Sequence, residues 1–400
     1  MKVLFINSVY KRGSTGKIVE QLHKYCTNNG IESYVCYGRG SKIDEKNVFK
    51  TSTEFLSKLN QIRSKMTGMV YSGNFFATNK LLRIIKRVNP DIVHIHNLND
   101  QFVNEYRLLN FLSKHKIKTV ITLHSEQMYT ATCGYALECN SWREEGCKKC
   151  PHLYLSTGSK LDKTKKAFLK LKSCYDNFDS DSIGFISCTP WLQERAKQSL
   201  LCSRFKHFTV LNGADELLYK DLSSVFVNDV KTQLNLDSNK KTVLFVNPRM
   251  ADPIKGYQFL EDINREYFDK YQIIVVGKVS DDIKREKEFT YLGEITNPHR
   301  LVEIYNCADY TIMLSKKECF PMVIVESLLC GTPVSLFKCE GPDNCFDNKF
   351  VKFSEYGLIN SVFENLSKFE CTRTKTREYA KERLSSLRMC SEYVKIYKSF

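Results

Sequence analysis

The chain has 400 residues, a length that favours two domains because single hydrophobic cores stop growing well below it. Its composition, 42% hydrophobic and 26% charged, is that of a globular protein, and no stretch approaches the ~20 apolar residues of a transmembrane helix, which excludes an integral membrane protein. The net charge of +15 attracts phosphates, nucleic acid or anionic lipids without choosing among them, and lysines that only solvate the surface explain it equally well.

Strands and helices are predicted to alternate through the first half of the chain. The apolar run at residues 3–7 is cut short by Asn7 and no small-residue cleavage site follows it, so we interpret it as a buried strand and not as an export signal. Further β-rich runs predict strands at residues 33–37, 92–96, 120–124 and 183–188. Apolar residues at helical spacing predict intervening helices, for example at residues 16–26, 79–88 and 104–115.

The second half repeats this α/β pattern. Strands are predicted at residues 243–247, 273–277, 310–315 and 334–337, with helices around Phe259, Leu301 and Val325. The polar segment 215–241 has no strong apolar period and is the best linker region. We therefore expect two doubly wound, Rossmann-like domains at residues 1–212 and 213–378, followed by a terminal helix at 379–400 that packs back on the N-terminal domain.

Sixteen cysteines in a chain without an export signal indicate reduced thiols in the cytoplasm. Four of them lie within 18 residues, in a Cys-rich insert at 130–152: Cys133, Cys139, Cys147 and Cys150. Four thiolates can close a tetrahedral zinc site, which would be structural because no position is left for water. Four free thiols or a redox pair are the alternative.

A basic, glycine-containing turn follows the first predicted strand. It runs from Lys11 to Lys17, and Gly13 and Gly16 would let the backbone approach a phosphate closely. The glycine spacing is too short for a Walker A loop, and Ile18 stands where Ser or Thr would hold magnesium. An ordinary strand-to-helix turn is an equally good interpretation.

Two carboxylates eight residues apart give the strongest local signal. Glu318 lies in the loop after the predicted strand that ends at Ser315, and Glu326 lies about one turn inside the next helix. Such a pair can reach two parts of one ligand. The simpler interpretation is an acid that favours the helix dipole together with a solvated Glu.

The segment from Glu318 to Glu326 resembles the E-x7-E signature of family 4 glycosyltransferases. Other segments are similar to that family in the same order: residues 90–96 and 189–195, an Asn-Gly-x-Asp crossover at 210–215, a strand, arginine and Lys-Gly loop at 243–256, and Gly-Thr-Pro-Val at 331–334. The Gly-Cys-x-x-Cys-Pro ending of the insert resembles a subset that builds polysaccharides, which favours zinc. The resemblance implies a GT-B fold, in which the two domains face across a cleft, and retaining transfer from a nucleotide sugar.

The resemblance also implies roles for individual residues. Arg249 and Lys255 would bind the donor diphosphate and compensate the charge that develops on the leaving nucleotide. Glu326 would accept hydrogen bonds from the ribose, and Glu318 and His124 would contact the transferred sugar. The other donor-binding residues that it implies are Gly13, Gly16, Asn212, Phe320, Pro321, Met322 and Val323. Because cationic side chains supply the compensation, no catalytic metal is expected.

The chain departs from the family pattern at two positions. Six positions separate Arg249 from Lys255, where about five are usual, which puts the direction of the arginine side chain in doubt. Cys319 stands after the first glutamate, where the family commonly has Gly or Asn. The expected acceptor is a saccharide or polyprenyl-linked saccharide of bacterial capsule or envelope assembly, with the enzyme peripheral at the cytoplasmic face of the cell membrane. The alternatives are a zinc-containing nucleic-acid-binding protein, or another GT-B enzyme such as a sugar-nucleotide epimerase.

Overall fold

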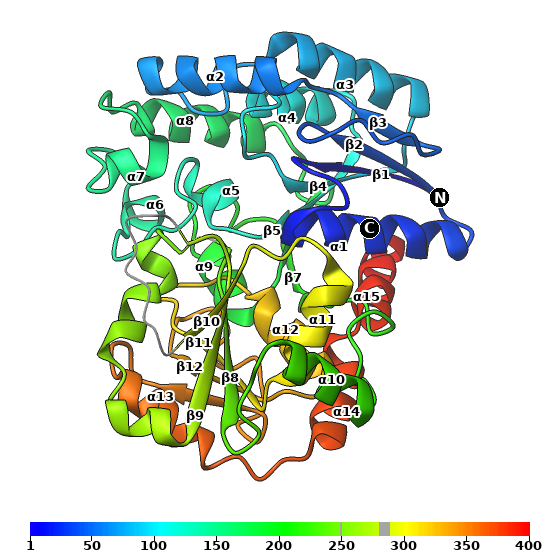
Figure 1. Cartoon of the computed structure of the whole chain (residues 1–400). Helices are drawn as coiled ribbons and strands as arrows, with labels where there is room; N and C mark the ends of the chain where they lie inside the picture. The colour runs from blue at the N-terminus through cyan, green and yellow to red at the C-terminus, as the bar shows by residue number, and fades with distance from the viewer. Residues whose placement is uncertain (249, 280–288) are drawn as a thin grey trace. The chain divides into compact units, whose positions relative to one another are not determined.

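The computed structural model describes residues 1–248, 250–279 and 289–400. The chain divides into two compact units: unit 1 comprises Met1–Leu211 and Cys390–Phe400, and unit 2 comprises Asn212–Met389. Each unit contains one parallel sheet between helices (Figure 1), so the prediction of two Rossmann-like α/β folds is confirmed.

The sheet of unit 1 has seven strands in the order β3-β2-β1-β4-β5-β6-β7, and every neighbouring pair is parallel. Its central strands are buried along nearly their whole length because helices cover both faces. The strands are β1 (Lys2–Asn7), β2 (Glu32–Tyr37), β3 (Val48–Lys50), β4 (Ile92–Asn97), β5 (Lys118–Leu123), β6 (Ile183–Ser187) and β7 (Lys206–Thr209).

Helices α3 and α4 lie on one face of this sheet and α1 lies on the other (Figure 1). The last helix of the chain, α15 (Ser386–Ser399), belongs to unit 1 from Cys390 onward. The other helices of unit 1 are α1 (Gly13–Asn28), α2 (Glu54–Thr67), α3 (Phe75–Val88), α4 (Glu105–Lys114), α5 (Gln127–Thr130), α6 (Ser141–Glu144), α7 (Leu153–Thr157), α8 (Thr164–Asp176) and α9 (Pro190–Lys197).

The sheet of unit 2 has six parallel strands in the order β10-β9-β8-β11-β12-β13. These strands are β8 (Lys241–Val246), β9 (Tyr271–Val276), β10 (Phe289–Gly293), β11 (Tyr310–Met313), β12 (Val334–Phe337) and β13 (Val351–Ser354). The helices are α10 (Ser224–Gln233), α11 (Pro298–Cys307), α12 (Met322–Leu329), α13 (Ile359–Leu366) and α14 (Arg373–Leu384), with 3-10 turns η1 (Pro253–Lys255), η2 (Tyr257–Asp262) and η3 (Arg265–Asp269). One large core joins the sheet to η2 and α13.

Three predicted elements differ from the structure. The helix expected around Phe259 is only the 3-10 turn η2, and the predicted linker at 215–241 contains α10, which Ser223 caps through its side chain. The single terminal helix at 379–400 is wrong, because Ser385 is extended between α14 and α15. There Ala214 pairs with the chain: its N–H donates to the Leu384 carbonyl, and its carbonyl accepts from the Ser386 N–H.

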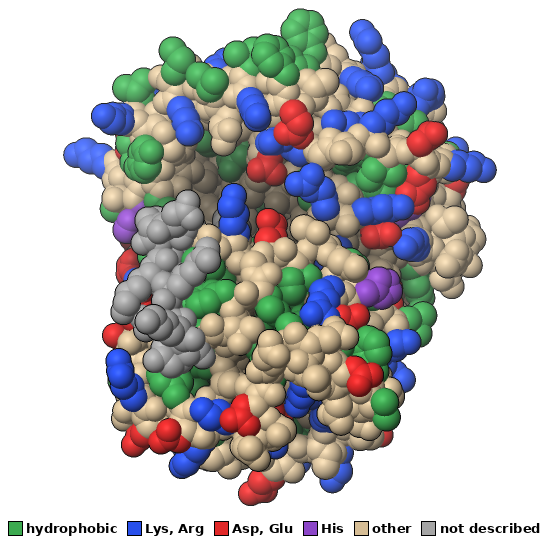
Figure 2. All heavy atoms as spheres, viewed as in Figure 1, with side chains coloured by type: hydrophobic (Ala, Val, Ile, Leu, Met, Phe, Trp, Pro, Cys, Tyr) green, Lys and Arg blue, Asp and Glu red, His purple; other side chains and the backbone are tan. Residues whose placement is uncertain are grey.

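The basic charge is not gathered into one patch on the face seen in Figure 2, where Lys and Arg side chains alternate with Asp and Glu over both units. In the part of the chain that the structure describes, no helix combines the length and the apolar character needed to cross a bilayer.

Candidate functional site

The carboxyl ends of β8 and β11 meet at one edge of the unit 2 sheet, because these two strands are parallel neighbours. The loop after β8 is clamped to the end of β11: the Lys316 N–H donates to the Ile254 carbonyl at 2.7 Å. Gly256 has φ +80°, and a Cβ there would lie 1.9 Å from the Leu314 carbonyl oxygen. Only glycine allows this approach, which fixes the preceding Lys255 beside the loop that follows β11.

Lys255 and Glu318 form a close ion pair at this edge. The Lys255 Nζ lies 2.6 Å from the Glu318 Oε1, and the two side chains are only 15% and 13% exposed. Gly341 packs directly against the backbone of Glu318, where a Cβ would lie 2.1 Å from the Glu318 carbonyl oxygen. Any larger residue at this position would displace the loop. Two of the predicted catalytic residues are thus brought together, largely shielded from water, where their charges act strongly.

The carboxylate of Glu326 is buried and held by two phenols. Its Oε1 accepts from the Tyr219 hydroxyl at 2.8 Å, and its Oε2 accepts from the Tyr305 hydroxyl at 3.2 Å. Burial, and then the charge of Glu326, raise the pKa of both tyrosines, so they stay protonated donors. A carboxylate oxygen can accept more than one hydrogen bond, so the two phenols do not by themselves prevent Glu326 from accepting one from a ligand hydroxyl.

The four predicted backbone contacts lie at the start of α12. Pro321 precedes the helix in an extended conformation, and Met322 and Val323 are in its first turn, where N–H groups have no acceptor within the helix. Phe320 is buried and stacks on Phe346, with ring centroids 5.6 Å apart. This geometry suits an anion or a sugar hydroxyl at the helix N-terminus.

Two further residues, Arg249 and Asn212, are predicted for this group, and Asn212 does not join it in the structure. Arg249 lies outside the described residues. Asn212 is buried near the junction of α14 and α15: a Cβ on the next residue, Gly213, would lie 2.3 Å from the Ser385 carbonyl oxygen, and the Gly213 N–H donates to the Met389 sulfur. The close packing at this junction therefore explains the Asn-Gly pair without a ligand.

A second ion pair beside Glu318 was not predicted from the sequence. Lys317 is almost completely buried, and its Nζ lies 3.0 Å from the Glu340 Oε2. The buried tyrosines that hold Glu326 were missed as well. Nothing in their local sequence marks them, because Tyr219 and Tyr305 reach the carboxylate from different segments of unit 2.

In unit 1, Gly13 and Gly16 belong to the first turn of α1 and not to a turn before it. A Cβ on Gly16 would lie 3.1 Å from the Val9 side chain and 3.3 Å from the Val9 carbonyl oxygen, so the loop after β1 packs tightly on the helix. Beside it is a cavity of about 470 Å³, lined by Val9, Arg12, Arg39, Gly40, Ser41, Glu54 and Asp100.

His124 follows β5 directly and belongs to a line of histidines. Its Nε2 lies 3.0 Å from the Nδ1 of His96, which stacks on it. The neighbouring His94 bonds Thr122 at 2.7 Å and the Tyr397 hydroxyl at 2.6 Å. Burial lowers the pKa of His124 to about 4, so at neutral pH its ring is uncharged and acts as a hydrogen-bonding group.

These histidines make unit 1 sensitive to acid. Burial holds the pKa of His94 and His96 well below the ordinary value of 6.5, as it does for His124, whereas burial raises the pKa of Glu105 to about 8. Well above pH 6.5, from about pH 7.5, the imidazoles are neutral in both states and their contribution is fully present. As the pH falls further, only the unfolded chain gains these protons. Burial also lowers the pKa of His23 and His207 in this unit, whereas Glu105 holds one extra proton in the folded state. The unfolded chain therefore binds more protons than the folded one, and unit 1 should lose about 2 kcal/mol or more per pH unit between pH 6 and 5.

Urea unfolding followed by tryptophan fluorescence measures this loss, since both tryptophans, Trp142 and Trp191, lie in unit 1. The exposed His115→Gln variant should show the same pH dependence as the native chain. Equal stability at pH 6.5 and 5 would contradict the prediction.

Comparison with known proteins connects both units to one family. The Glycosyltransferase Family 4 model matches residues 15–156, and the Glycosyl transferases group 1 model matches residues 227–383. The chain belongs to the family 4 glycosyltransferases. This confirms the family that the sequence motifs predicted. Retention of the anomeric configuration is consistent with belonging to this family. The membership favours sugar transfer over nucleic-acid binding or epimerisation.

Individual relatives of this glycosyltransferase agree. It is 22% identical to WcaC of Escherichia coli K12, over the whole of both chains, a protein whose name places it as a glycosyl transferase in colanic acid biosynthesis. Its fold is similar to HepE of Anabaena, solved with UDP and glucose (TM-score 0.67, 17% identity, 100% of both chains). It is also similar to WaaG, a glycosyltransferase involved in lipopolysaccharide biosynthesis (TM-score 0.66, 13% identity, 98% and 99% of the two chains). These structures confirm the GT-B fold.

The cysteine cluster of the glycosyltransferase is gathered but not arranged around a metal. The Cys133 and Cys150 thiols share a hydrogen bond, which lowers the pKa of Cys150 to about 6, and the Cys147 thiol donates to the Thr130 carbonyl at 3.2 Å. Among the described residues, no group of three or more His, Cys, Asp or Glu is placed to hold a metal ion. The donor set has the chemistry of zinc, but thiols such as that of Cys147 would have to turn toward a common centre, so structural zinc stays a prediction.

We predict one tightly held zinc per chain. Elemental analysis of the purified protein should give a ratio near one, and the four thiols should react with a thiol reagent only after a strong chelator is added. A metal-free protein with all four thiols freely titratable in the folded state would contradict it. Activity should need no added divalent ion.

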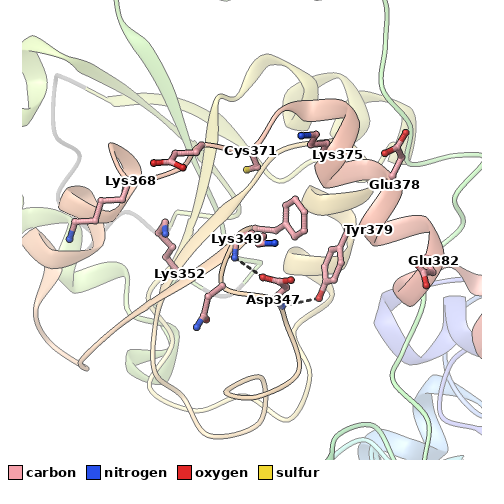
Figure 3. A pocket seen from close by; sticks show the side chains of 12 residues that line it. Asp347, Lys349, Lys352, Lys368, Cys371, Lys375, Glu378, Tyr379 and Glu382 are labelled. Carbon is pink, nitrogen blue, oxygen red and sulfur yellow. Dashed lines mark hydrogen bonds between the residues drawn. The ribbon is translucent and has the colours of Figure 1, made fainter.

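One large cavity in the described part of unit 2 is not part of this site. It measures about 880 Å³ and lies between α14 and the segment that precedes β13 (Figure 3). There the Asp347 N–H donates to the Tyr379 hydroxyl at 2.9 Å, among Lys and Glu side chains of both signs. Ligands of open α/β sheets bind at the carboxyl ends of strands, and this cavity is at the amino end of β13.

Proposed function

We propose that this chain transfers a hexose, with retention, from a nucleoside diphosphate sugar to a saccharide or polyprenyl-linked saccharide in bacterial surface polysaccharide assembly. The observation that carries the proposal is the Lys255–Glu318 pair, 2.6 Å apart at the carboxyl edge of the unit 2 sheet. A cation and an anion held together there match a donor that carries negative phosphates next to a hydroxyl-rich sugar.

On binding, the donor would replace the ion pair between Lys255 and Glu318 with its own contacts to both side chains. Its diphosphate would take the ammonium of Lys255, and the freed oxygens of Glu318 would accept hydrogen bonds from the sugar hydroxyls. The α12 N-terminus would add N–H groups from Met322 and Val323, and Glu326 would receive the ribose hydroxyls beside its two tyrosines. Arg249 would be a second cation for the diphosphate.

Transfer would proceed on one face of the sugar. The bond from the anomeric carbon to the diphosphate oxygen breaks, and its electron pair leaves on the phosphate, which Lys255 stabilises. The acceptor hydroxyl oxygen forms the new bond on the same face and gives its proton to the leaving phosphate. His124 would lie beside the sugar, as the resemblance implies. Because its imidazole is neutral, it can orient a hydroxyl but not supply a positive charge.

The acceptor would enter beside the first turn of α1. The cavity of about 470 Å³ next to Gly13 and Gly16 has room for a saccharide end, and the guanidinium and carboxylate groups of Arg12, Arg39 and Glu54 offer polar contacts. Similarity to WcaC supports an envelope or capsule polysaccharide. An acceptor on a polyprenyl lipid would require the enzyme to work peripherally at the cytoplasmic face of the membrane.

Nucleotide release from a panel of nucleotide sugars, with and without lipid-linked saccharide, tests the reaction. We expect release that depends on both substrates, and a product whose anomeric NMR coupling constant shows an α-linkage from an α-configured donor. A β-linked product would refute retention while leaving transfer intact. Conversion of the nucleotide sugar into an epimer without release would refute transfer.

A further inference from the structure

Helix α2 of unit 1 carries its large apolar side chains on the outside. Four of them recur at helical spacing along one stripe, and each is at least half exposed: Phe55 (73%), Leu59 (52%), Ile62 (55%) and Met66 (71%). An ordinary surface helix turns such a stripe toward the core. The orientation of α2 is therefore inverted.

The inner side of α2 is polar and fits that orientation. Its only buried residues are Ser57 and Ser64, and Asn60 accepts a hydrogen bond from the Asn74 N–H at 2.7 Å. The Ser57 hydroxyl pairs with that of Ser52 at 3.2 Å. These hydrogen bonds fix the orientation of α2, with the polar side facing the rest of unit 1 and the apolar stripe facing outward.

Further apolar side chains extend the stripe into a face. Asn74 ties the start of α3 to the middle of α2, and two residues later Phe76 is 79% exposed. At the other end, Gly68 approaches the Leu161 carbonyl closely, and the Leu161 side chain is half exposed. Figure 2 shows hydrophobic side chains gathered over α2 and α3, with Lys and Arg around them.

The charge around this face is mostly positive. Residues 54–88 contain seven Lys or Arg and one acid, Glu54, which is itself paired with Arg39 at 2.7 Å. Residues 158–172, which adjoin the end of α2, contain six Lys and one Asp. An apolar stripe within a basic border is the pattern of a helix that lies in the interface of an anionic bilayer.

We propose that the α2 face, made of Phe55, Leu59, Ile62, Met66, Phe76 and Leu161, docks the enzyme onto an anionic membrane surface. Its apolar side chains enter the headgroup boundary, and its lysines and arginines meet the lipid phosphates. A second copy of the chain is a poor occupant, because a two-fold contact would press this basic border against itself.

The position of α2 connects docking to the acceptor. Glu54, the first residue of the helix, lines the cavity of about 470 Å³ beside α1. A bilayer on the α2 face would therefore lie close to the mouth of that cavity, where a saccharide on a lipid tail would enter. This step rests on the proposed function, whereas membrane docking itself does not.

Flotation with vesicles of phosphatidylcholine, with or without 30% phosphatidylglycerol, tests the proposal on the full chain. The native protein should float with the anionic vesicles and should dissociate as salt is raised. The Leu59→Gln/Ile62→Gln variant should bind at least about tenfold more weakly, since each side chain contributes apolar area to the bilayer. The matched Leu217→Gln/Leu387→Gln variant, with two exposed leucines of unit 2, should float like the native protein.

Nucleotide release with a water-soluble acceptor separates docking from catalysis. Both variants should match the native rate there, and only the α2 variant should lose rate with lipid-linked acceptor in vesicles. Native-like flotation of the α2 variant, or no preference for anionic vesicles, would overturn the proposal. A native dimer that the α2 variant converts to monomer, without vesicle binding, would assign the face to self-association instead. Failure of sugar transfer with flotation unchanged would refute the proposed function alone.

Discussion

Replacing Lys255 by Ala should lower the turnover rate at saturating donor by about 100- to 1,000-fold, the usual effect of removing one group that stabilises developing charge. The ammonium contributes most when the leaving diphosphate gains charge, so donor affinity should change much less than turnover. Its near-burial beside Glu318 strengthens the effect, because little water is present to replace it. Steady-state rates and donor affinity, measured with the best nucleotide sugar of the panel, give the two quantities.

Two controls accompany this variant. Lys338→Ala removes an exposed lysine whose partner, Glu355, is also exposed, and it should leave turnover unchanged. Thermal unfolding of Lys255→Ala should show that the protein still folds although Glu318 has lost its partner. Unchanged turnover at saturating donor would refute the role of Lys255.

Replacing Glu326 by Gln should have the opposite kinetic signature. Donor affinity should fall by about 10- to 100-fold, because the ribose would lose hydrogen bonds to a charged acceptor. Turnover at saturation should change little, since ribose contacts are nearly equal in the ground state and the transition state. Gln keeps one acceptor oxygen for the phenols of Tyr219 and Tyr305, which makes it milder than Ala.

Tyr305→Phe is the matched control for this variant. It removes one of the two hydroxyls that hold the carboxylate and leaves the charge in place, so its effect on donor affinity should be the smaller one. A collapse of turnover in Glu326→Gln with unchanged affinity would mean that Glu326 acts in the chemical step and not on the ribose.

The strands that the sequence predicts and those that it misses differ in their position in the sheet. All nine predicted strands are present. The described part of the chain contains four further strands, β3, β7, β10 and β13, which are the two edges of each sheet. An edge strand has one neighbour and is partly exposed, so it needs no continuous apolar run. β7, for example, has no buried residue, whereas the central β1 is buried from Val3 to Asn7.

The candidate site shows the same division between local and distant information. Lys255 and Glu318 were predicted from motifs, and the structure places them 2.6 Å apart because β8 and β11 are parallel neighbours. The phenol that approaches each oxygen of Glu326 comes from a residue 107 or 21 positions away. Such partners carry no periodic or spacing signal, and only the packed fold reveals them.

The last eleven residues complete the first unit, and this has a consequence for biosynthesis. His94 and Thr122 emerge early from the ribosome, but the hydroxyls they bond, on Tyr397 and Tyr393, are made only after the residues of unit 2. Residues 1–211 therefore cannot complete the packing of unit 1 until residues 390–400 have been synthesised. Residues 212–389 are made in between and can fold into unit 2 before that. A truncated translation product that lacks α15 is expected to be a target for chaperones and proteases even though almost all of the chain is present.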